Sequence, residues 1–510
     1  MSNYSPVATQ EKELGVAIKR PEKSKDLLIE ENVPTRMPGD GTVEMKRQMG
    51  LVSAVALIVG GMIGSGIFIS PKGVLERSGS VSVCLLVWTG CGILSLLGAL
   101  CYAELGTIIP MSGGEYAYLL KTFSGMGTVG PIPAFLYIWT CVFLLKPAAL
   151  AIMCLTFAEY VVEPLYPNCD PPIVVKKIIS CLAIALIVFV NCYSVKLATR
   201  IQNIFTAAKL LAVTIVVIAG AVSLAQGNNE HLIPDFEHST RSFSNIATAF
   251  YFGLWAYEGW NYINYVTEEL VNPYVNLPRA IIIAIPLVTL CYALTNIAYL
   301  SVMSPAELLA SEVVAVKFAN RMLGPAAVII PIFVASSAFG AGNAGCFTTG
   351  RLSFVAAREG HLVDVLSYIH VKRLTPLPAL MFNGFITICM IAAGNIASLI
   401  DFFSFAAWFF YGTAVSTVIV LRWTKKDVPR PYKVPLIIPI IVVIICIYLV
   451  MAPILQNPTI EYLYASLFIF SGLIVYIPFV HFKIQLRIMK KITETLQLVL
   501  TVAPTHSYSG

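Results

Sequence analysis

Long apolar runs recur along the chain from about residue 50 to residue 481. Each run is about twenty residues long, enough for an α-helix to cross a hydrocarbon core of about 30 Å. Hydrophobic residues make up 57% of the chain and charged residues 12%, and only helices or closed barrels satisfy their backbone hydrogen bonds inside lipid. The sequence predicts an all-α polytopic membrane protein with about twelve transmembrane helices. The expected ranges are 50–78, 81–104, 131–161, 172–195, 203–226, 244–266, 279–302, 325–350, 377–394, 400–421, 435–454 and 460–481.

The positions of Lys and Arg predict how these helices are oriented. Basic residues gather in alternate loops, and such loops usually face the cytoplasm. Both termini are therefore expected in the cytoplasm. The polar, proline-containing residues 1–48 predict a disordered N-terminal tail, and residues 482–510 predict a cytoplasmic C-terminal tail. The basic residues line loop ends rather than one patch, so no nucleic-acid partner is expected.

Two of the predicted spans are interrupted by glycine. The first contains Val59–Phe68, with glycines at four of its ten positions, and the sixth contains Gly253 and Gly259 on either side of Glu258. Broken helices in corresponding places of two halves are typical of transporters built from inverted repeats. The sequence therefore predicts a 5+5 inverted repeat that carries a small polar solute. Its parts are a first repeat at 49–226, a second repeat at 244–422 and two appended helices at 434–481.

The break in the first span predicts a site for an anion. Unwinding at Ile63–Phe68 leaves backbone N–H groups at the start of a half-helix, where the helix dipole favours a carboxylate. Gly64 and Gly66 allow close approach, and Ser65 adds a hydroxyl donor. The alternative is that Gly60 and Gly64 only allow two helices to pack closely.

The break in the sixth span predicts a complementary site for a cation. Backbone carbonyls freed by unwinding can accept hydrogen bonds from an ammonium group, and Glu258 can attract a second positive charge. A carboxylate inside a membrane is a functional candidate because of its energetic cost. The alternatives are an internal ion pair between Glu258 and Lys146, and a packing role alone for Trp255, which is otherwise large enough to close over a solute.

Signs of an enzyme, a metal centre or a cofactor site are missing from the sequence. All six histidines lie outside the confident span interiors, and there is no H-E-x-x-H or G-x-S-x-G motif. A G-x-G-x-x-G pattern at Gly340, Gly342 and Gly345 lies inside a span and follows no strand, which excludes a dinucleotide site. We therefore expect neither catalysis nor a cofactor, and a channel would not need two broken helices.

Cys169 is the one cysteine of twelve outside the spans and their ends. It lies in the proline-dense stretch Pro164–Pro172, on the side predicted to be outer. A lone cysteine in an oxidising compartment suggests a disulfide with another chain. An unpaired thiol is the alternative.

Several motifs together resemble the light chains of the heteromeric amino acid transporters, in the amino acid–polyamine–organocation superfamily. The motifs are Ile63–Gly73, Tyr102–Thr107, Ser112–Tyr116, Asn191–Lys196, Tyr265–Glu269, Arg351–His361 and Arg430–Pro435. The resemblance runs from about Met45 to the end of the chain. It implies a leucine-transporter-like fold and sodium-independent, obligatory exchange of amino acids at the plasma membrane. It also implies a single-pass, glycosylated heavy chain that is disulfide-linked through Cys169.

Within this family, Gly253–Asn261 and Phe143–Pro147 look closest to the exchangers of cystine and dibasic amino acids. Those relatives have a gating tryptophan at the position of Trp255 and an aspartate at that of Glu258. The carboxylate of Glu258 reaches about 1.5 Å further than that of an aspartate, which affects the expected ranking of substrates. Large-neutral carriers usually have glycine there, so a neutral exchanger, with Glu258 neutralised by Lys146 or by a proton, is the alternative.

The sequence and the resemblance together predict a role for each candidate residue. We expect the substrate carboxylate at the N–H groups of Ser65, Gly66 and Ile67. We expect the α-ammonium at the carbonyls of Ile63, Trp255 and Ala256, and the distal positive group at Glu258. Trp255 is the predicted gate, and Asn261 is also expected to contact substrate.

Lys209 lies one helical turn inside the fifth predicted span. Its side chain can reach the cytoplasmic interface, as long basic side chains near helix ends often do. By resemblance, its ammonium instead replaces the sodium ion of sodium-coupled relatives and joins the first and eighth spans.

Overall fold

The computed structural model describes residues 49–111, 113–166, 171–373, 375–456, 460–484 and 487–504. The predicted N-terminal tail at 1–48 and Cys169 lie outside these residues. In the described part, almost all regular structure is helical, with one two-stranded sheet. The α-helices are α1 (Leu51–Met62), α2 (Gly66–Ser78), α3 (Val81–Ile108), α4 (Glu115–Phe123), α5 (Ile132–Thr140), α6 (Lys146–Val162), α7 (Ile173–Tyr193), α8 (Val195–Ala225), α9 (Phe243–Ala256), α10 (Pro273–Val302), α11 (Pro305–Leu309), α12 (Val314–Met322), α13 (Ile329–Arg358), α14 (Leu377–Ala393), α15 (Ile396–Thr424), α16 (Ile437–Gln456), α17 (Ile460–Val475) and α18 (Arg487–Leu500).

The described residues form nine helical segments that are long and apolar enough to cross a membrane. The bent pair α1 and α2 makes a tenth span, and the two remaining predicted spans correspond to shorter helices. The helix α9 has 14 residues because the chain unwinds after Ala256, and α14 has 17 because it ends at Gly394. The all-α polytopic class is confirmed, and these two helices account for the difference from twelve full-length spans.

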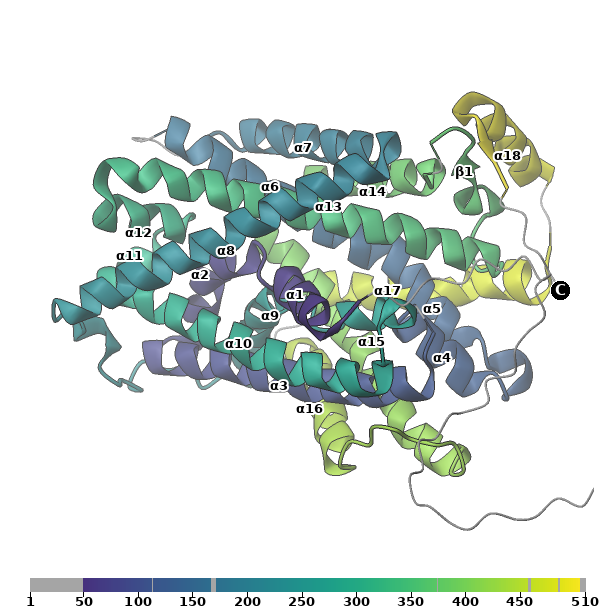
Figure 1. Cartoon of the computed structure of the whole chain (residues 1–510), viewed down its shortest axis with the longest axis horizontal. Coiled ribbons are helices and arrows are strands. Elements are labelled where there is room, and N and C mark those ends of the chain that lie inside the picture. Colours follow the sequence, from purple (N-terminus) through teal and green to yellow (C-terminus); the bar gives the residue numbers. More distant parts are fainter. Residues whose placement is uncertain are drawn as a thin grey trace, which may run out of the picture. The chain divides into compact units, whose positions relative to one another are not determined.

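Helices that are five spans apart in the predicted order pack against each other (Figure 1). The pairs are α2 with α9, α3 with α10, α6 with α13, and α7 with α14. Each pair joins a helix of residues 49–226 to one of residues 244–422. This packing brings the two interrupted spans together.

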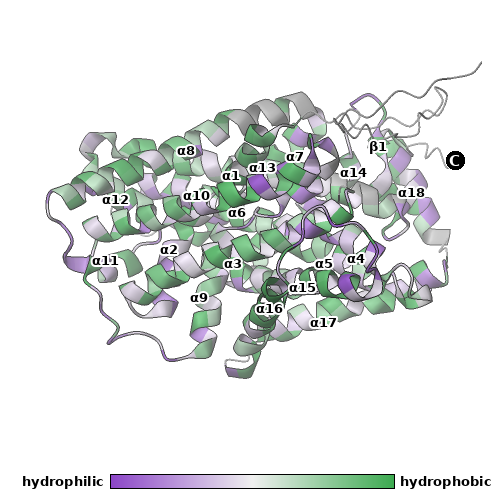
Figure 2. Cartoon of the chain, turned by 60° about the horizontal axis from the view of Figure 1, so that its bottom comes forward, coloured by the Kyte–Doolittle hydropathy of each residue, from purple (hydrophilic) through white to green (hydrophobic). Residues whose placement is uncertain are grey.

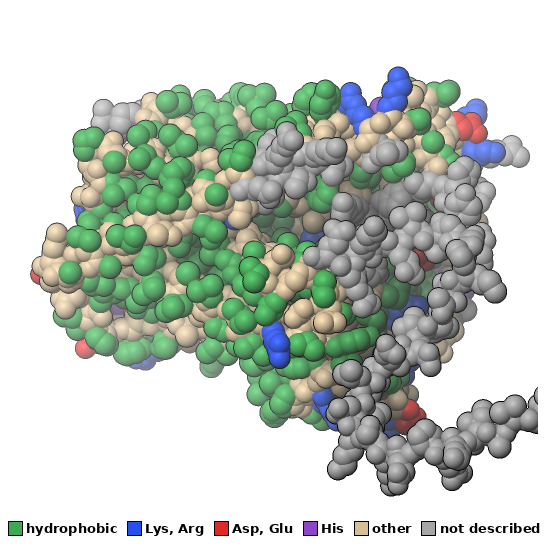
Figure 3. Space-filling model, viewed as in Figure 1, with side chains coloured by type: hydrophobic (Ala, Val, Ile, Leu, Met, Phe, Trp, Pro, Cys, Tyr) green, Lys and Arg blue, Asp and Glu red, His purple; other side chains and the backbone are tan. Residues whose placement is uncertain are grey.

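The outward-facing surfaces of the long helices are apolar. Phe189 of α7, Leu290 of α10 and Ile444 of α16 are each more than half exposed, as expected where lipid rather than water is the solvent. Figure 2 shows mostly hydrophobic residues along the long helices, and more hydrophilic ones in α18. Figure 3 shows a broad hydrophobic face on which Lys, Arg, Asp and Glu lie mainly toward the ends of the helices.

A buried carboxylate joins α3 to α15 and to the loop that follows it. Glu104 is fully buried and accepts two hydrogen bonds from Arg422, at 3.0 and 2.5 Å. Arg430 lies 3.7 Å from the same carboxylate, and the backbone N–H of Val434 donates to it at 2.8 Å. A buried charge is tolerated when it is paired and hydrogen-bonded in this way.

Part of the predicted C-terminal tail is ordered. The amphipathic helix α18 is followed by the strand β2 (Val502–Ala503), which pairs antiparallel with β1 (Ile369–His370). The strand β1 lies in the connection between α13 and α14. The tail therefore packs onto the loops at this end of the bundle.

Candidate functional site

The interruption of the first span lies where the sequence predicts it. The helix α1 ends at Met62 and α2 begins at Gly66, and the two axes are bent by 51°. Ile63, Ser65, Gly66 and Ile67 are all buried. The first N–H groups of any α-helix lack partners within that helix, so the start of α2 presents hydrogen-bond donors inside the protein.

The interruption of the sixth span depends on Gly259. The helix α9 ends at Ala256, and Gly259 has a φ of +107°, a conformation that residues with a side chain rarely adopt. The chain then turns into the 3-10 helix η5 (Tyr262–Tyr265). The span therefore changes direction directly beside Glu258.

The two interruptions are in direct contact. A Cβ atom on Gly66 would lie 2.4 Å from the Cα atom of Ala256, and one on Gly259 would lie 2.9 Å from the carbonyl carbon of Gly61. The hydroxyl of Tyr292, in α10, is 2.7 Å from the carbonyl oxygen of Met62 and 2.8 Å from that of Ala256. The hydroxyl therefore bridges the ends of α1 and α9.

Glu258 lies at a small cavity beside these breaks. Tyr411, in α15, donates a hydrogen bond to its Oε1 atom at 2.8 Å, and in the described part of the chain this is the one hydrogen bond that the side chain of Glu258 makes. The cavity has a volume of about 20 Å³, which is enough for one water molecule. It is lined by Tyr137, Cys141, Leu145, Lys146, Glu258, Tyr265, Phe403, Ala407, Phe410 and Tyr411.

Lys146 lines the same cavity but is not in an ion pair with Glu258. Among the described residues, no carboxylate lies within 4.0 Å of its ammonium. The ammonium instead lies 5.6 Å from the ring centroid of Tyr265 and 6.0 Å from that of Tyr262. Lys146 directly follows the π-helical turn η2 (Cys141–Leu145), a rare distortion that often marks functional sites.

Trp255 and Asn261 are buried next to the cavity but do not line it. The ring centroid of Trp255 is 5.0 Å from that of Phe403, in an edge-to-face arrangement. The amide of Asn261 donates to the carboxylate of Glu115 at 2.5 Å. In this conformation the nitrogen of Asn261 is therefore engaged by the protein itself.

Lys209 is 2% exposed, and its ammonium donates to the carbonyl of Gly60 in α1. This position excludes an extended side chain at the membrane interface. The predicted link to the first span is present, whereas the described residues give no hydrogen bond from Lys209 to the eighth span, α13.

The structure adds four residues that sequence reasoning did not assign to the site. Tyr292 joins the two breaks, Tyr411 binds Glu258, and Tyr137 and Tyr265 form part of the cavity wall. A lone tyrosine in an apolar span has no spacing signal, so sequence alone gave no reason to select Tyr292 or Tyr411.

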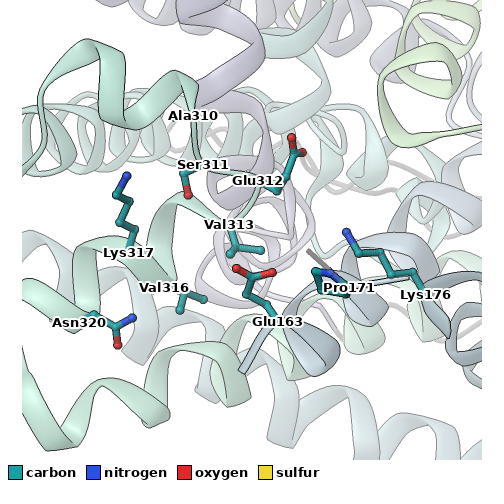
Figure 4. Close-up of a pocket in the computed structure, with 10 residues that line it drawn as sticks. All are labelled: Glu163, Pro171, Lys176, Ala310, Ser311, Glu312, Val313, Val316, Lys317 and Asn320. Carbon is teal, nitrogen blue, oxygen red and sulfur yellow. The ribbon is translucent and has the colours of Figure 1, made fainter. Parts of the chain in front are cut away.

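A second, larger pocket lies on the side predicted to be outer (Figure 4). It has a volume of about 480 Å³ and lies between the ends of α6 and α7 and the α11–α12 segment. Its lining includes Glu163 and Pro171, which come shortly before and directly after residues 167–170, and the charged side chains of Lys176, Glu312 and Lys317. This pocket is polar and is distinct from the cavity at Glu258.

Two ion pairs hold α2 at this outer end. Arg77 is 3.2 Å from Asp401 of α15, and Lys72 is 2.6 Å from Glu312, between α11 and α12. The guanidinium of Arg77 also lies 4.1 Å from the ring centroid of Phe252 in α9. In this conformation α2 is therefore attached to three neighbouring elements.

The α11–α12 segment is itself fixed by a capping box. The side chains of Ser304 and Glu307 bond each other's backbone N–H groups. Arg321 of α12 donates to the Glu307 carboxylate, and this hydrogen bond lowers the pKa of Glu307 to about 2. The carboxylate therefore stays ionised at any physiological pH.

Residues 49–479 match the family model described as amino acid permease. This chain belongs to the amino acid permease family. The permease is 54% identical to the b(0,+)-type amino acid transporter 1 of Mus musculus and 52% identical to that of Homo sapiens, each over 91% of this chain and 94% of the relative. It is 47% identical to the large neutral amino acids transporter small subunit 2 of Homo sapiens, over 84% of this chain and 79% of that relative.

The contact between the two breaks predicts different effects for two neighbouring glycines. Gly66→Ala places its methyl group 2.4 Å from the backbone of Ala256, whereas at Gly64 the nearest atom would be 3.8 Å away. We expect Gly66→Ala to destabilise the fold by about 1–3 kcal/mol through overpacking. Gly64→Ala is expected to change the stability by at most about 1 kcal/mol, because Gly64 lacks a positive φ and alanine fits such a position without strain. Thermal unfolding of the two purified variants measures this difference, and equal melting temperatures would contradict the close contact.

Proposed function

We propose that this permease exchanges cationic amino acids and cystine for neutral amino acids, without sodium, by alternating access. The observation that carries the proposal is the position of Glu258. Its carboxylate lines a cavity beside two broken helices and accepts a hydrogen bond from Tyr411. Such a group attracts the distal positive charge of a dibasic substrate, because charge pairing is strong where water is scarce. The 54% sequence identity with a b(0,+)-type amino acid transporter supports the proposed substrate class.

The substrate's amino acid head would bind at the crossing of the breaks. Its carboxylate would accept hydrogen bonds from the N–H groups of Ser65, Gly66 and Ile67, at the positive end of the α2 dipole. Its α-ammonium would donate to the carbonyls of Ile63, Trp255 and Ala256. The contact between Gly66 and Ala256 supports this assignment, because it brings donors and acceptors to one place.

Alternating access would use the two halves at 49–226 and 244–422 as inverted repeats. Five spans is an odd number, so a second copy of a five-span unit enters the membrane with the opposite orientation. The pairing of helices five spans apart supports these boundaries. Opening of the outer side would require the ion pairs of Arg77 and Lys72 to separate, after which Trp255 would close over a bound substrate.

Sodium independence would follow from Lys209. Its ammonium is buried and bonded to a carbonyl of α1, and it supplies a fixed positive charge where a sodium-coupled carrier needs a bound cation. In the proposed mechanism it also approaches the eighth span.

The proposed partner is a single-pass glycoprotein heavy chain that forms a disulfide with Cys169 at the plasma membrane, with both termini of the permease in the cytoplasm. Glu163 and Pro171, which precede and follow Cys169 in the sequence, line the pocket on the side predicted to be outer. The described cysteines are all unpaired, and most are buried within helices. They therefore offer few competing sites for a bridge between chains.

Arginine uptake into sodium-free proteoliposomes tests the proposed exchange. Uptake of labelled arginine is expected in vesicles that are preloaded with leucine and not in empty vesicles, because obligatory exchange needs an internal substrate. Equal uptake into empty vesicles would indicate a uniporter or a channel. Leucine–leucine exchange without arginine uptake would indicate the neutral exchanger.

The charge of Glu258 is tested by Glu258→Gln, which keeps the size of the side chain. The apparent affinity for arginine is expected to fall by about tenfold or more relative to leucine, because a charge-assisted contact is lost. Competition of each amino acid against labelled leucine measures the ratio, and Glu230→Gln, at an exposed residue of the 3-10 helix Glu230–Leu232, is a matched control. An unaltered ratio would show that Glu258 does not recognise the distal cation.

The disulfide is tested by Cys169→Ser. In non-reducing electrophoresis of cell membranes, a higher-mass band that reducing agent removes is expected for the wild type and not for this variant. Cys389→Ser is the control, because Cys389 is an exposed free cysteine of α14. The same high-mass band in both variants would contradict the assignment of Cys169.

A further inference from the structure

A second carboxylate lies directly behind the cavity at Glu258. Glu115, the first residue of α4, is fully buried, and it is not among the residues that line the cavity. Its Oε2 atom accepts hydrogen bonds from Tyr265 at 2.6 Å and from Tyr137 at 3.1 Å, and its Oε1 atom accepts one from Asn261 at 2.5 Å. Three neutral donors thus hold this buried carboxylate, and no Lys or Arg among the described residues forms an ion pair with it.

The tyrosines that bind Glu115 also form part of the cavity wall. Tyr137 and Tyr265 both line the cavity, and their hydroxyl oxygens are 3.1 Å apart. One layer of side chains therefore separates Glu115 from the space beside Glu258. Charges this close to a poorly hydrated cavity are only weakly screened.

Lys146 lines the same cavity as Glu258 and lies against the wall that holds Glu115. Its ammonium lies over the ring of Tyr265, whose hydroxyl binds Glu115. In the described part of the chain, the charged groups that line the cavity or bond to its lining are two carboxylates and one ammonium. Two negative charges and one positive charge leave a net charge of minus one.

We propose that Glu115 is a specificity-determining residue that keeps the cavity negative although Lys146 is present. Without Glu115, the charge of Lys146 would cancel that of Glu258, and the site would not favour a cationic side chain over a neutral one. With Glu115, the remaining negative charge matches the one net positive charge of a dibasic amino acid. This inference rests on the proposed function, because it concerns the choice between cationic and neutral substrates at the same site.

In this proposal Glu115 acts through its charge and does not contact the substrate. A purely structural role would use its three hydrogen bonds to tie α4, α5 and the unwound part of the sixth span together. The two roles predict different results when one negative charge is removed and the net charge is then restored by removing the positive charge of Lys146. A structural role depends on the hydrogen bonds of Glu115, whereas the proposed role depends on the sum of the charges.

Charge compensation in the full-length permease tests the proposal. Glu115→Gln removes one negative charge, and the ratio of arginine to leucine affinity is expected to fall by about tenfold. The double variant Glu115→Gln with Lys146→Met returns the net charge to minus one and is expected to restore the ratio to within about threefold of the wild type. Glu115→Asp keeps the charge and is expected to keep the preference. All ratios come from competition against leucine self-exchange in leucine-loaded proteoliposomes.

The outcomes separate this proposal from the proposed function. A wild type that does not bind arginine would overturn both. A wild type that prefers arginine, with the same preference in Glu115→Gln, would overturn only the role of Glu115. A low ratio in both Glu115→Gln and the double variant would show a structural role and would also overturn it. If Glu115→Gln does not reach the membrane, the double variant decides alone, since the proposal requires it to prefer arginine.

Discussion

Gly66 lies so close to Ala256 that the two interrupted spans share one crossing point, where a Cβ atom would be 2.4 Å from the neighbouring backbone. Most features of the site depend on this contact. It places the N–H groups at the start of α2 beside the last carbonyls of α9, which gives one location both donors and acceptors. Tyr292 stabilises the crossing by bridging the carbonyls of Met62 and Ala256. A larger residue at Gly66 would separate the donors from the acceptors.

Three glutamates inside the helical bundle show how environment sets the role of one side-chain type. Glu104 is matched by Arg422 and Arg430 and joins helices. Glu115 is held by two hydroxyls and an amide, which stabilise its charge without cancelling it. Glu258 faces a cavity with one hydrogen bond from Tyr411. The first carboxylate is neutralised by neighbouring cations. In the proposed mechanism the second affects the cavity through its wall, and the third attracts the distal cation of the substrate. This gradation follows from the cost of leaving a charge unpaired away from water.

The outer end of α2 is fixed in a different way from its inner end. At the inner end, the backbone at Gly66 packs directly against the backbone of Ala256. A change of conformation can move these two segments relative to each other without breaking an ion pair. At the outer end, Arg77 and Lys72 form ion pairs with two separate elements. The Lys72–Glu312 pair is exposed on the Glu312 side, and exposed ion pairs contribute little net stability, so this pair can form and separate at small cost. Such contacts suit an element that must move during transport.

The sequence by itself determined the membrane class, the approximate positions of the spans, the two interruptions and the selection of Glu258 and Lys209. These features are local, because hydropathy over about twenty residues and the conformational freedom of glycine do not depend on distant residues. It also predicted an ion pair of Glu258 with Lys146 as an alternative, and assigned Asn261 to substrate. Only the tertiary structure decided that Lys146 lies over Tyr265, that Asn261 binds Glu115, and that Tyr411 binds Glu258. The partners in each of these contacts are more than 100 residues apart in the chain, so their pairing depends on how the helices pack.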